Sequence, residues 1–319
     1  MSLRRGAVAG AGVAAGLGLA YAVQRTATLR WQVGADELAA AGRTLPGDLR
    51  HHFVAVSDGG RIHAVERGGA GIEAPTVVLV HGICLGIATW APQLRGLGGR
   101  VVAVSQRGHG QSQAGADGYR FDRLGTDLLE VLDALDVRDA VLVGHSMGGM
   151  IAQLLAVTRP EELAGRVRRL VLVATTPGPL LTAPFSAFIT AGTGRVLAAA
   201  ERRGRGPFPS SLSIWAARTA FGARPSPADI QLLCWMLDAM SPAALAELLP
   251  HLLAFDVRER LGSVSLPTHA VVGTRDVLTP ARTSRAIAAR IPGARLTTLP
   301  GSGHMVMLER AEALCDLLR

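Results

Sequence analysis

Lysine is absent from this chain, so all 33 basic side chains are arginine. Aromatic residues are also scarce, at 4% of 319 residues, which argues against a base-stacking surface for nucleic acid. The arginines are scattered along the sequence, whereas a nucleic-acid footprint is normally concentrated. Although the formal charge is +8, the sequence therefore predicts no nucleic-acid partner.

Cysteine occurs three times, and the positions match no metal or redox motif. We therefore expect no metal, and nothing in the sequence predicts another cofactor. Cys234 and Cys315 are interpreted as small apolar core residues. Cys84 lies in a loop after a predicted strand, where it is placed to line a pocket. The oligomeric state is not predicted.

The amino-terminal segment carries no charge from residue 6 to residue 23, directly after two arginines. This is about the minimum length of a membrane span, roughly 17–25 residues. Residues 1–24 are therefore predicted to anchor the protein in the cell membrane. Two alternatives stay open: a cleaved signal peptide of a secreted protein, since residues 20–22 fit a cleavage site, and a helix packed on the domain. Residues 25–50 are interpreted as a linker.

From residue 51 onward, apolar segments of strand length alternate with helical patterns. The first two flank Asp58-Gly59-Gly60 and predict a hairpin. The later ones are almost continuously apolar, which is typical of a parallel sheet covered on both faces. We therefore predict an α/β fold with a mostly parallel eight-stranded sheet flanked by helices. The strand segments after the hairpin lie at 76–80, 100–104, 140–143, 167–174, 268–273 and 294–298.

The alternation stops between residues 177 and 265, where helical patterns are interrupted by proline and glycine. We interpret residues 177–265 as a helical cap inserted after the sixth strand. The core then consists of residues 51–176 and 266–319.

The segment GHSMGG, residues 144–149, places a serine between two glycines directly after an apolar strand. A sharp strand-to-helix turn needs glycine at Gly144 and Gly148, because side chains there would clash, and it pushes the Ser146 hydroxyl away from the backbone. The N–H groups at the start of the next helix point toward the same place. The turn therefore predicts a nucleophile beside hydrogen-bond donors.

A serine nucleophile needs a base, and the base needs an orienting acid. For this turn the expected chain order is serine, acid, histidine. Of the three later histidines, His251 falls in the cap and His269 in a strand, which leaves His304 in a loop after the last strand. Among the carboxylates between Ser146 and His304, Asp276 alone follows a strong apolar strand, at the edge where parallel sheets place their sites. The predicted catalytic residues are therefore Ser146, Asp276 and His304.

The same chemistry needs donors for a developing oxyanion. The backbone N–H of Met147 begins the helix after Ser146, and the N–H of Ile83 lies in the loop His81-Gly82-Ile83 after the third strand. We predict that these two form the oxyanion hole. His81 and His145 are interpreted as braces of their loops.

Four motifs resemble the α/β-hydrolase fold superfamily from about residue 52 to the end of the chain. They are HGI at 81–83, RGHGQS at 107–112, GHSMGG at 144–149, and GTRDVLTP with GSGHMVMLERAE at 273–280 and 301–312. The resemblance implies the Ser146–Asp276–His304 triad and the cap after the sixth strand, and it is closest to esterases, lipases and cofactor-free haloperoxidases. One position departs from the pattern, because Ser105 stands where relatives commonly carry aspartate.

These observations predict a serine hydrolase that cleaves carboxylic esters through an acyl-enzyme. Apolar cap residues and two methionines near His304 predict an apolar small-molecule ester as substrate. They are Trp215, Phe221, Trp235, Met236, Met305 and Met307. Perhydrolase, lactonase, C–C bond hydrolase and acyltransferase activity on the same triad remain alternatives, as does a membrane-anchored binding protein without activity.

Overall fold

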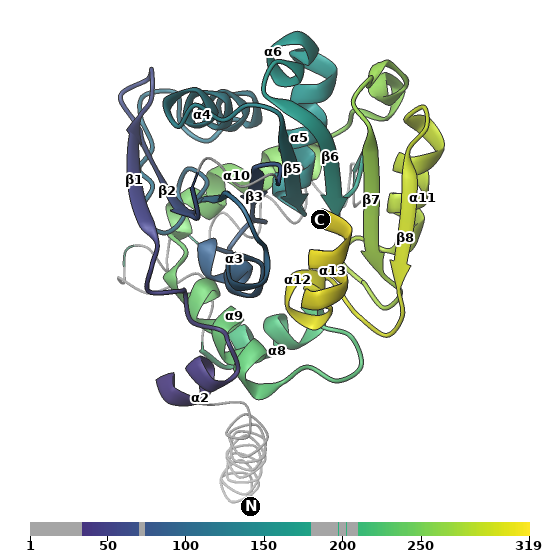
Figure 1. Cartoon of the computed structure of the whole chain (residues 1–319). Coiled ribbons are helices and arrows are strands. Elements are labelled where there is room, and N and C mark those ends of the chain that lie inside the picture. The colour runs from purple at the N-terminus through teal and green to yellow at the C-terminus, as the bar shows by residue number, and fades with distance from the viewer. Residues whose placement is uncertain (1–33, 70–73, 180–196, 198–201, 203–209) are drawn as a thin grey trace, which may run out of the picture.

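The computed structural model describes residues 34–69, 74–179, 197, 202 and 210–319 (Figure 1). At its centre is an eight-stranded sheet in the order β1-β2-β4-β3-β5-β6-β7-β8. The first three strands in this order pair antiparallel, and all other neighbours pair parallel. The strands are β1 (Arg50–Ala55), β2 (Arg61–Arg67), β3 (Val77–Val80), β4 (Val101–Val104), β5 (Ala140–His145), β6 (Val167–Val173), β7 (Thr268–Gly273) and β8 (Arg295–Leu299).

The burial of each strand follows from its sequence. Every residue of β3, β4 and β5 is buried, as expected for apolar runs at the centre of a sheet covered on both faces. In β1, at the edge, exposed residues alternate with half-buried ones. The turn between β1 and β2 contains Gly59 with φ of +83°, a conformation that side chains disfavour. The predicted hairpin and mostly parallel eight-stranded sheet are confirmed.

Helices cover both faces of the sheet, as Figure 1 shows. One layer contains α3 (Ala91–Gly96), α12 (Val306–Glu309) and α13 (Ala311–Leu318), which contact one another. The other contains α4 (Phe121–Ala134), α5 (Met147–Thr158) and α11 (Ala281–Arg290), with α4 packed on α5 and α11 on β7. Shorter elements are the 3-10 helices η1 (Ile87–Trp90) and η2 (Arg258–Ser263), and α6 (Pro160–Ala164) and α2 (Ala35–Ala40).

The described residues between β6 and β7 include three α-helices, which confirms the helical cap inserted after the sixth strand. They are α8 (Ser210–Ala220), α9 (Pro227–Ala239) and α10 (Pro242–Ala254). A serine caps the N-terminus of α9 and of α10. The hydroxyl of Ser226 accepts from Asp229 N at 3.1 Å, and that of Ser241 accepts from Ala244 N at 3.2 Å. In Figure 1, α8 and α9 lie beyond the carboxyl ends of the parallel strands. The exact limits at 177 and 265 stay predictions.

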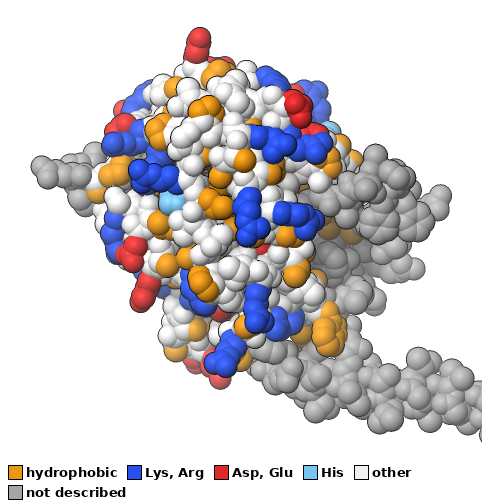
Figure 2. Space-filling view, turned by 90° about the vertical axis from the view of Figure 1, so that its right-hand side faces the viewer, with side chains coloured by type: hydrophobic (Ala, Val, Ile, Leu, Met, Phe, Trp, Pro, Cys, Tyr) orange, Lys and Arg blue, Asp and Glu red, His pale blue; other side chains and the backbone are white. Residues whose placement is uncertain are grey.

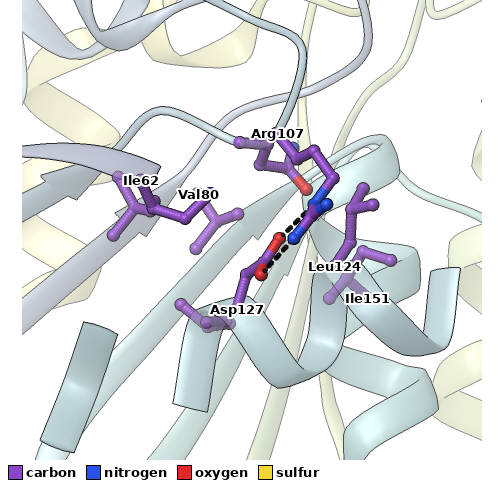
Figure 3. A pocket seen from close by; sticks show the side chains of 9 residues that line it. Ile62, Val80, Arg107, Leu124, Asp127 and Ile151 are labelled. Atoms are coloured by element: carbon purple, nitrogen blue, oxygen red, sulfur yellow. Dashed lines mark hydrogen bonds and ion pairs between the residues drawn. The ribbon is translucent and has the colours of Figure 1, made fainter. Parts of the chain in front are cut away.

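A buried ion cluster ties the hairpin to the core. Arg107, with 0% of its side chain exposed, donates to both carboxylate oxygens of Asp127 at 2.7 and 2.9 Å (Figure 3). It also donates to both oxygens of Asp58 in the hairpin turn, at 2.7 and 2.9 Å. Because two carboxylates accept four hydrogen bonds from Arg107, and Gly118 O accepts another at 3.2 Å, the desolvation of the guanidinium is compensated.

On the face shown in Figure 2, arginine side chains lie in separate small groups between uncharged residues. This matches their scattered positions in the sequence.

The predicted membrane segment, residues 6–23, lies outside the described residues, and the anchor stays a prediction. Within the described residues, no single helix has the length and apolar character of a membrane span. The helices α9 and α10 meet these criteria only as a pair, bent by 101° at their junction.

Candidate active site

Ser146 occupies a strained turn between β5 and α5. Its φ of 51° and ψ of −116° are rare for a residue with a side chain. Two contacts hold the turn, because Ser146 N donates to Val173 O at 3.0 Å and the Thr175 hydroxyl donates to Ser146 O at 2.7 Å. The β6 strand and the loop after it therefore fix the serine backbone.

Gly144 and Gly148 make this turn possible. A Cβ on Gly144 would lie 2.6 Å from Gly148 O, and one on Gly148 would lie 2.4 Å from Val80 O. Both distances are shorter than any carbon side chain tolerates. The glycines thus allow α5 to begin directly against β3 and β5.

His304 and Asp276 meet at the carboxyl end of the sheet. His304 Nδ1 lies 2.9 Å from Asp276 Oδ2, and both side chains are almost completely buried. Asp276 Oδ1 accepts two backbone N–H groups, from Leu278 at 2.9 Å and from Thr279 at 2.8 Å. The Thr279 hydroxyl donates to Asp276 Oδ2 at 2.7 Å and lies 3.1 Å from His304 Nδ1.

These contacts decide the charge of Asp276. Burial raises the pKa of its carboxyl, but His304 and the hydrogen bonds from Thr279 outweigh burial, and the net pKa lies below the usual value. The carboxyl is therefore ionised at neutral pH. An ionised carboxylate at Nδ1 keeps the proton on that atom, so Nε2 of His304 is left as the basic nitrogen.

The loop that carries His304 is also held from two other directions. His304 N donates to Ala220 O at the end of cap helix α8, at 2.7 Å. The ring of His145, fully buried beneath, lies with Nε2 3.0 Å from His304 O. Burial holds the pKa of His145 well below its ordinary value, so its ring is neutral and donates this hydrogen bond. This is the bracing role that the sequence predicted for His145.

The loop after β3 also lies against Ser146, because a Cβ on Gly82 would be 2.9 Å from the Ser146 Cβ. His81 Nδ1 lies 2.7 Å from Gly82 O, and His81 Nε2 accepts from Gln106 N at 3.0 Å. Burial lowers the pKa of His81 to about 3, so the ring is neutral and braces the loop, as predicted. Ile83 lines the same cavity as Ser146, and Met147 is the first residue of α5. Their role as oxyanion donors stays a prediction.

His109, in the RGHGQS motif, fixes the same loop. Its Nε2 accepts from Cys84 N at 3.0 Å, where Cys84 has φ of 58°, and its Nδ1 lies 3.0 Å from Arg107 O. Burial lowers the pKa of His109 to about 4, so the ring stays neutral at pH 7. Ser105, which departs from the pattern that the sequence resembles, braces this loop, because its hydroxyl donates to His109 O at 2.9 Å.

A cavity of about 310 Å³ lies between the sheet and the cap. Its lining is almost entirely apolar, and His304 is the only ionisable ring in it within the described part of the chain. Cys84 belongs to it, as expected, and burial raises the pKa of its thiol to about 12, so the thiol is neutral. The lining residues are Ile83, Cys84, Leu85, Ser146, Met150, Ala216, Thr219, Ala220, Leu233, Leu237, Leu252, Leu278, Thr279, His304 and Met305.

The residues predicted to supply apolar surface to a substrate are mostly different ones. Of the six, Met305 alone lines the cavity. Trp235 is 48% exposed, because it lies two residues from both Leu233 and Leu237 and so points to the opposite side of α9. Trp215 is 55% exposed, whereas Phe221 is buried elsewhere in the core.

Three contact residues were not singled out from the sequence: Thr279, His109 and Glu309. Each lies inside a motif that the sequence analysis quotes, but its role depends on contact with a distant segment. The other late histidines lie away from this site, with His251 in α10 and His269 in β7, where its Nε2 is 2.9 Å from the Thr297 hydroxyl. Among the described residues, no group of three histidine, cysteine or acidic side chains is placed to hold a metal ion.

Comparison with known proteins agrees with this architecture. The family model for the alpha/beta hydrolase fold matches residues 75–311. A protein named putative carbamate hydrolase RutD, from Stutzerimonas stutzeri strain A1501, is 29% identical over 255 residues, or 77% of this chain and 91% of that protein. The non-heme chloroperoxidase of Burkholderia pyrrocinia is 30% identical over 268 residues, with 77% and 91% covered.

A similar solved structure is that of a hydrolase from Pseudomonas aeruginosa PA01. It has 33% sequence identity and a TM-score of 0.67, and the match covers 85% of this chain and 96% of that one. The chain therefore belongs to the alpha/beta hydrolase fold family, a family of hydrolases.

Proposed function

We propose that the protein is a serine hydrolase that cleaves carboxylic esters with an apolar acyl or alcohol group. The observation that carries this proposal is that Ser146, on a strained turn, lines the same cavity as His304, whose Nδ1 lies 2.9 Å from Asp276. This arrangement supports the assignment of nucleophile, base and orienting acid to these residues, in the chain order that acyl transfer requires.

In the acylation step, Nε2 of His304 takes the proton of the Ser146 hydroxyl as Oγ bonds to the ester carbon. The backbone N–H groups of Ile83 and Met147 stabilise the negative oxygen of the tetrahedral intermediate. The C–O bond then breaks, and His304 gives its proton to the leaving alcohol. Asp276 remains ionised throughout and stabilises the imidazolium.

In the second step, Nε2 of His304 removes a proton from water as the water oxygen attacks the acyl carbon. The intermediate collapses, His304 returns the proton to Ser146 Oγ, and the acid leaves. No metal or redox group takes part in either step. An alcohol in place of water would make the same site an acyltransferase.

The cavity supports an uncharged, apolar substrate. Its walls are leucine, isoleucine, alanine and methionine side chains, with polar atoms supplied by Ser146, Thr219, Thr279 and His304. A carboxylate or ammonium group placed there would lose its hydration without a charged partner. We therefore expect short and medium aliphatic esters to be hydrolysed faster than charged ones.

An ester assay with the Ser146→Ala variant tests the proposal. Wild type is expected to hydrolyse p-nitrophenyl acetate, butyrate and octanoate, and the variant to lose about 10³-fold or more in kcat. Activity that persists in Ser146→Ala would overturn the proposal. The panel includes a lactone and an aryl carbamate, because one relative is named a carbamate hydrolase. Faster turnover of the lactone or the carbamate would change the proposed substrate class, and the proposed catalytic triad would stay the same.

We also propose that residues 6–23 hold the enzyme at the cell membrane. The support is the length and apolar composition of this segment. To test the membrane anchor, cells that express either the full chain or a variant that starts at residue 25 are fractionated. The full chain is expected in the membrane fraction and the shortened chain in the supernatant. Release of a full-domain fragment into the medium would instead indicate a cleaved signal.

A further inference from the structure

Glu309 contacts the two segments that meet beside the catalytic histidine. It is the last residue of α12, five positions after His304, and its half-buried side chain turns back over the loop. Oε1 accepts from Gly303 N at 2.7 Å, and Oε2 accepts from Gly222 N at 2.8 Å. Gly303 directly precedes His304, whereas Gly222 lies two residues after Ala220, the end of cap helix α8.

The two segments already run against each other. His304 N donates to Ala220 O at 2.7 Å, and Ala223 N donates to Gly301 O at 3.1 Å. They approach so closely that a Cβ on Gly222 would lie 2.1 Å from Gly301 O. A pair of short segments with few hydrogen bonds is marginally stable alone, and the Glu309 carboxylate adds two charge-assisted bonds across it.

The groups around Glu309 determine the pKa of its carboxyl. Burial raises the pKa of its carboxyl, the N–H groups of Gly222 and Gly303 lower it, and Asp229 on α9 raises it further while Arg310 lowers it. The net pKa lies above the ordinary value. A carboxylate kept in such a place needs both N–H donors, since an unpaired one would be strongly disfavoured.

We propose that Glu309 is a positioning residue that fastens the His304 loop to the end of cap helix α8, so that the cap fixes how the histidine ring reaches Ser146. The inference rests on the proposed function, because it assumes that His304 is the base. Since α12 packs on η1 and α3 of the core, Glu309 joins core, cap and histidine loop at one point. The cap end at residues 220–223 and His304 then move as one unit.

The test compares wild type with Glu309→Ala, Glu309→Gln and the control Glu312→Gln, whose side chain is exposed on α13. Steady-state ester kinetics are combined with amide hydrogen exchange. Glu309→Ala is expected to lower kcat by roughly 10- to 100-fold with KM within about threefold, because the base is misplaced while the cavity stays intact. Glu309→Gln keeps one acceptor oxygen and should fall between Glu309→Ala and wild type. Glu312→Gln should match wild type.

Amide hydrogen exchange detects the contact between the two segments independently of enzyme activity. Both segments, residues 220–223 and 301–305, should exchange faster in Glu309→Ala, while strands β3 and β5 keep wild-type rates. Unchanged exchange, unchanged kcat, or faster exchange spread over the whole protein would overturn the inference. If wild type cleaves no ester, or Ser146→Ala stays active, the proposed function fails instead, and the exchange data still decide whether Glu309 joins the two segments.

Discussion

Ser146 and His304 line one cavity, but closely packed glycine backbone surrounds the first, whereas the Asp276 carboxylate orients the side chain of the second. The nucleophile side, named for the role proposed for Ser146, consists of Ser146, its flanking glycines and the loop after β3 that His81 and His109 brace. The base side consists of Asp276, Thr279, His304 and Glu309. On the nucleophile side, close backbone contacts and neutral buried rings leave little freedom. On the base side, one carboxylate accepts four hydrogen bonds, and the loop depends on the cap.

The difference teaches that the two halves of a site can be fixed by different physical terms. Close backbone packing and two hydrogen bonds to its backbone fix the serine, whereas an ionised carboxylate and side-chain hydrogen bonds orient the histidine ring. The two sides should therefore respond differently to pH and to substitution.

Acid should weaken the nucleophile side first. The pKa of His81 is about 3 and that of His109 about 4 in the folded protein, against about 6.5 when unfolded. Because the folded pKa lies below the unfolded one, the unfolded chain binds more protons below pH 6.5, and stability falls as pH falls. Each histidine should cost on the order of 3 kcal/mol by pH 4.

Urea unfolding from pH 7.5 to 4 measures this loss. His109→Gln keeps an acceptor for Cys84 N and should reduce the slope of stability against pH by about one proton. The base side responds later, since the lowered pKa of Asp276 means that its contribution is present above pH 3.8 and lost below it. Constant stability between pH 6.5 and 4.5 would contradict this account.

Arg107→Met should be the most damaging single substitution, at about 3–5 kcal/mol, because it leaves buried Asp58 without its ion-pair partner and leaves buried Asp127 paired with Arg123 alone. The loop that carries His109 loses its support at the same time. Arg168→Met is the control, since its pair with Asp139 is exposed and should cost under about 1 kcal/mol. Chemical denaturation compares the two, and equal losses would show that the buried cluster is not special.

Gly148→Ala should cost about 1–3 kcal/mol and distort the serine turn, because the new Cβ would lie 2.4 Å from Val80 O. Gly98→Ala is the matched control, since nothing lies within 4 Å of its Cβ position. Stability and ester turnover should both drop in the first variant and stay near wild type in the second. A fully active Gly148→Ala enzyme would show that the turn tolerates a side chain.

Thr279→Val should have the smallest effect, about 1 kcal/mol, because it removes one buried hydrogen bond to Asp276. It should also lower kcat several-fold, whereas Thr279→Ser, which retains the hydroxyl, should restore it. The kcat of both variants against pH is the measurement. If Thr279→Val and Thr279→Ser have the same kcat, the Thr279 hydroxyl does not contribute to the base side.

The nucleophile side could be predicted from the sequence because its information is local. The spacing of Gly144, Ser146 and Gly148 after an apolar strand describes a turn within six residues. The central strands β3 and β4 were predicted for the same reason, since each is a continuous apolar run. Asp276 and His304 were found by chain order and elimination, and the structure brings their side chains together.

The rest depends on contacts between distant segments. The contact between Glu309 and Gly222 joins residues 87 positions apart in the sequence, and no local pattern predicts it. The side of α9 that faces the cavity could not be predicted either, because composition alone does not give the rotation of a helix about its axis. Trp235 was therefore expected at the substrate, whereas Leu233 and Leu237 line the cavity.

The most direct test of the central claim is covalent labelling with a fluorophosphonate, which reacts only with an activated serine. Peptide mapping by mass spectrometry should find one adduct, on Ser146, formed at least about 100-fold more slowly in His304→Ala. A protein that does not label, as a non-catalytic binding protein would not, or one that labels equally well in Ser146→Ala, would contradict the account.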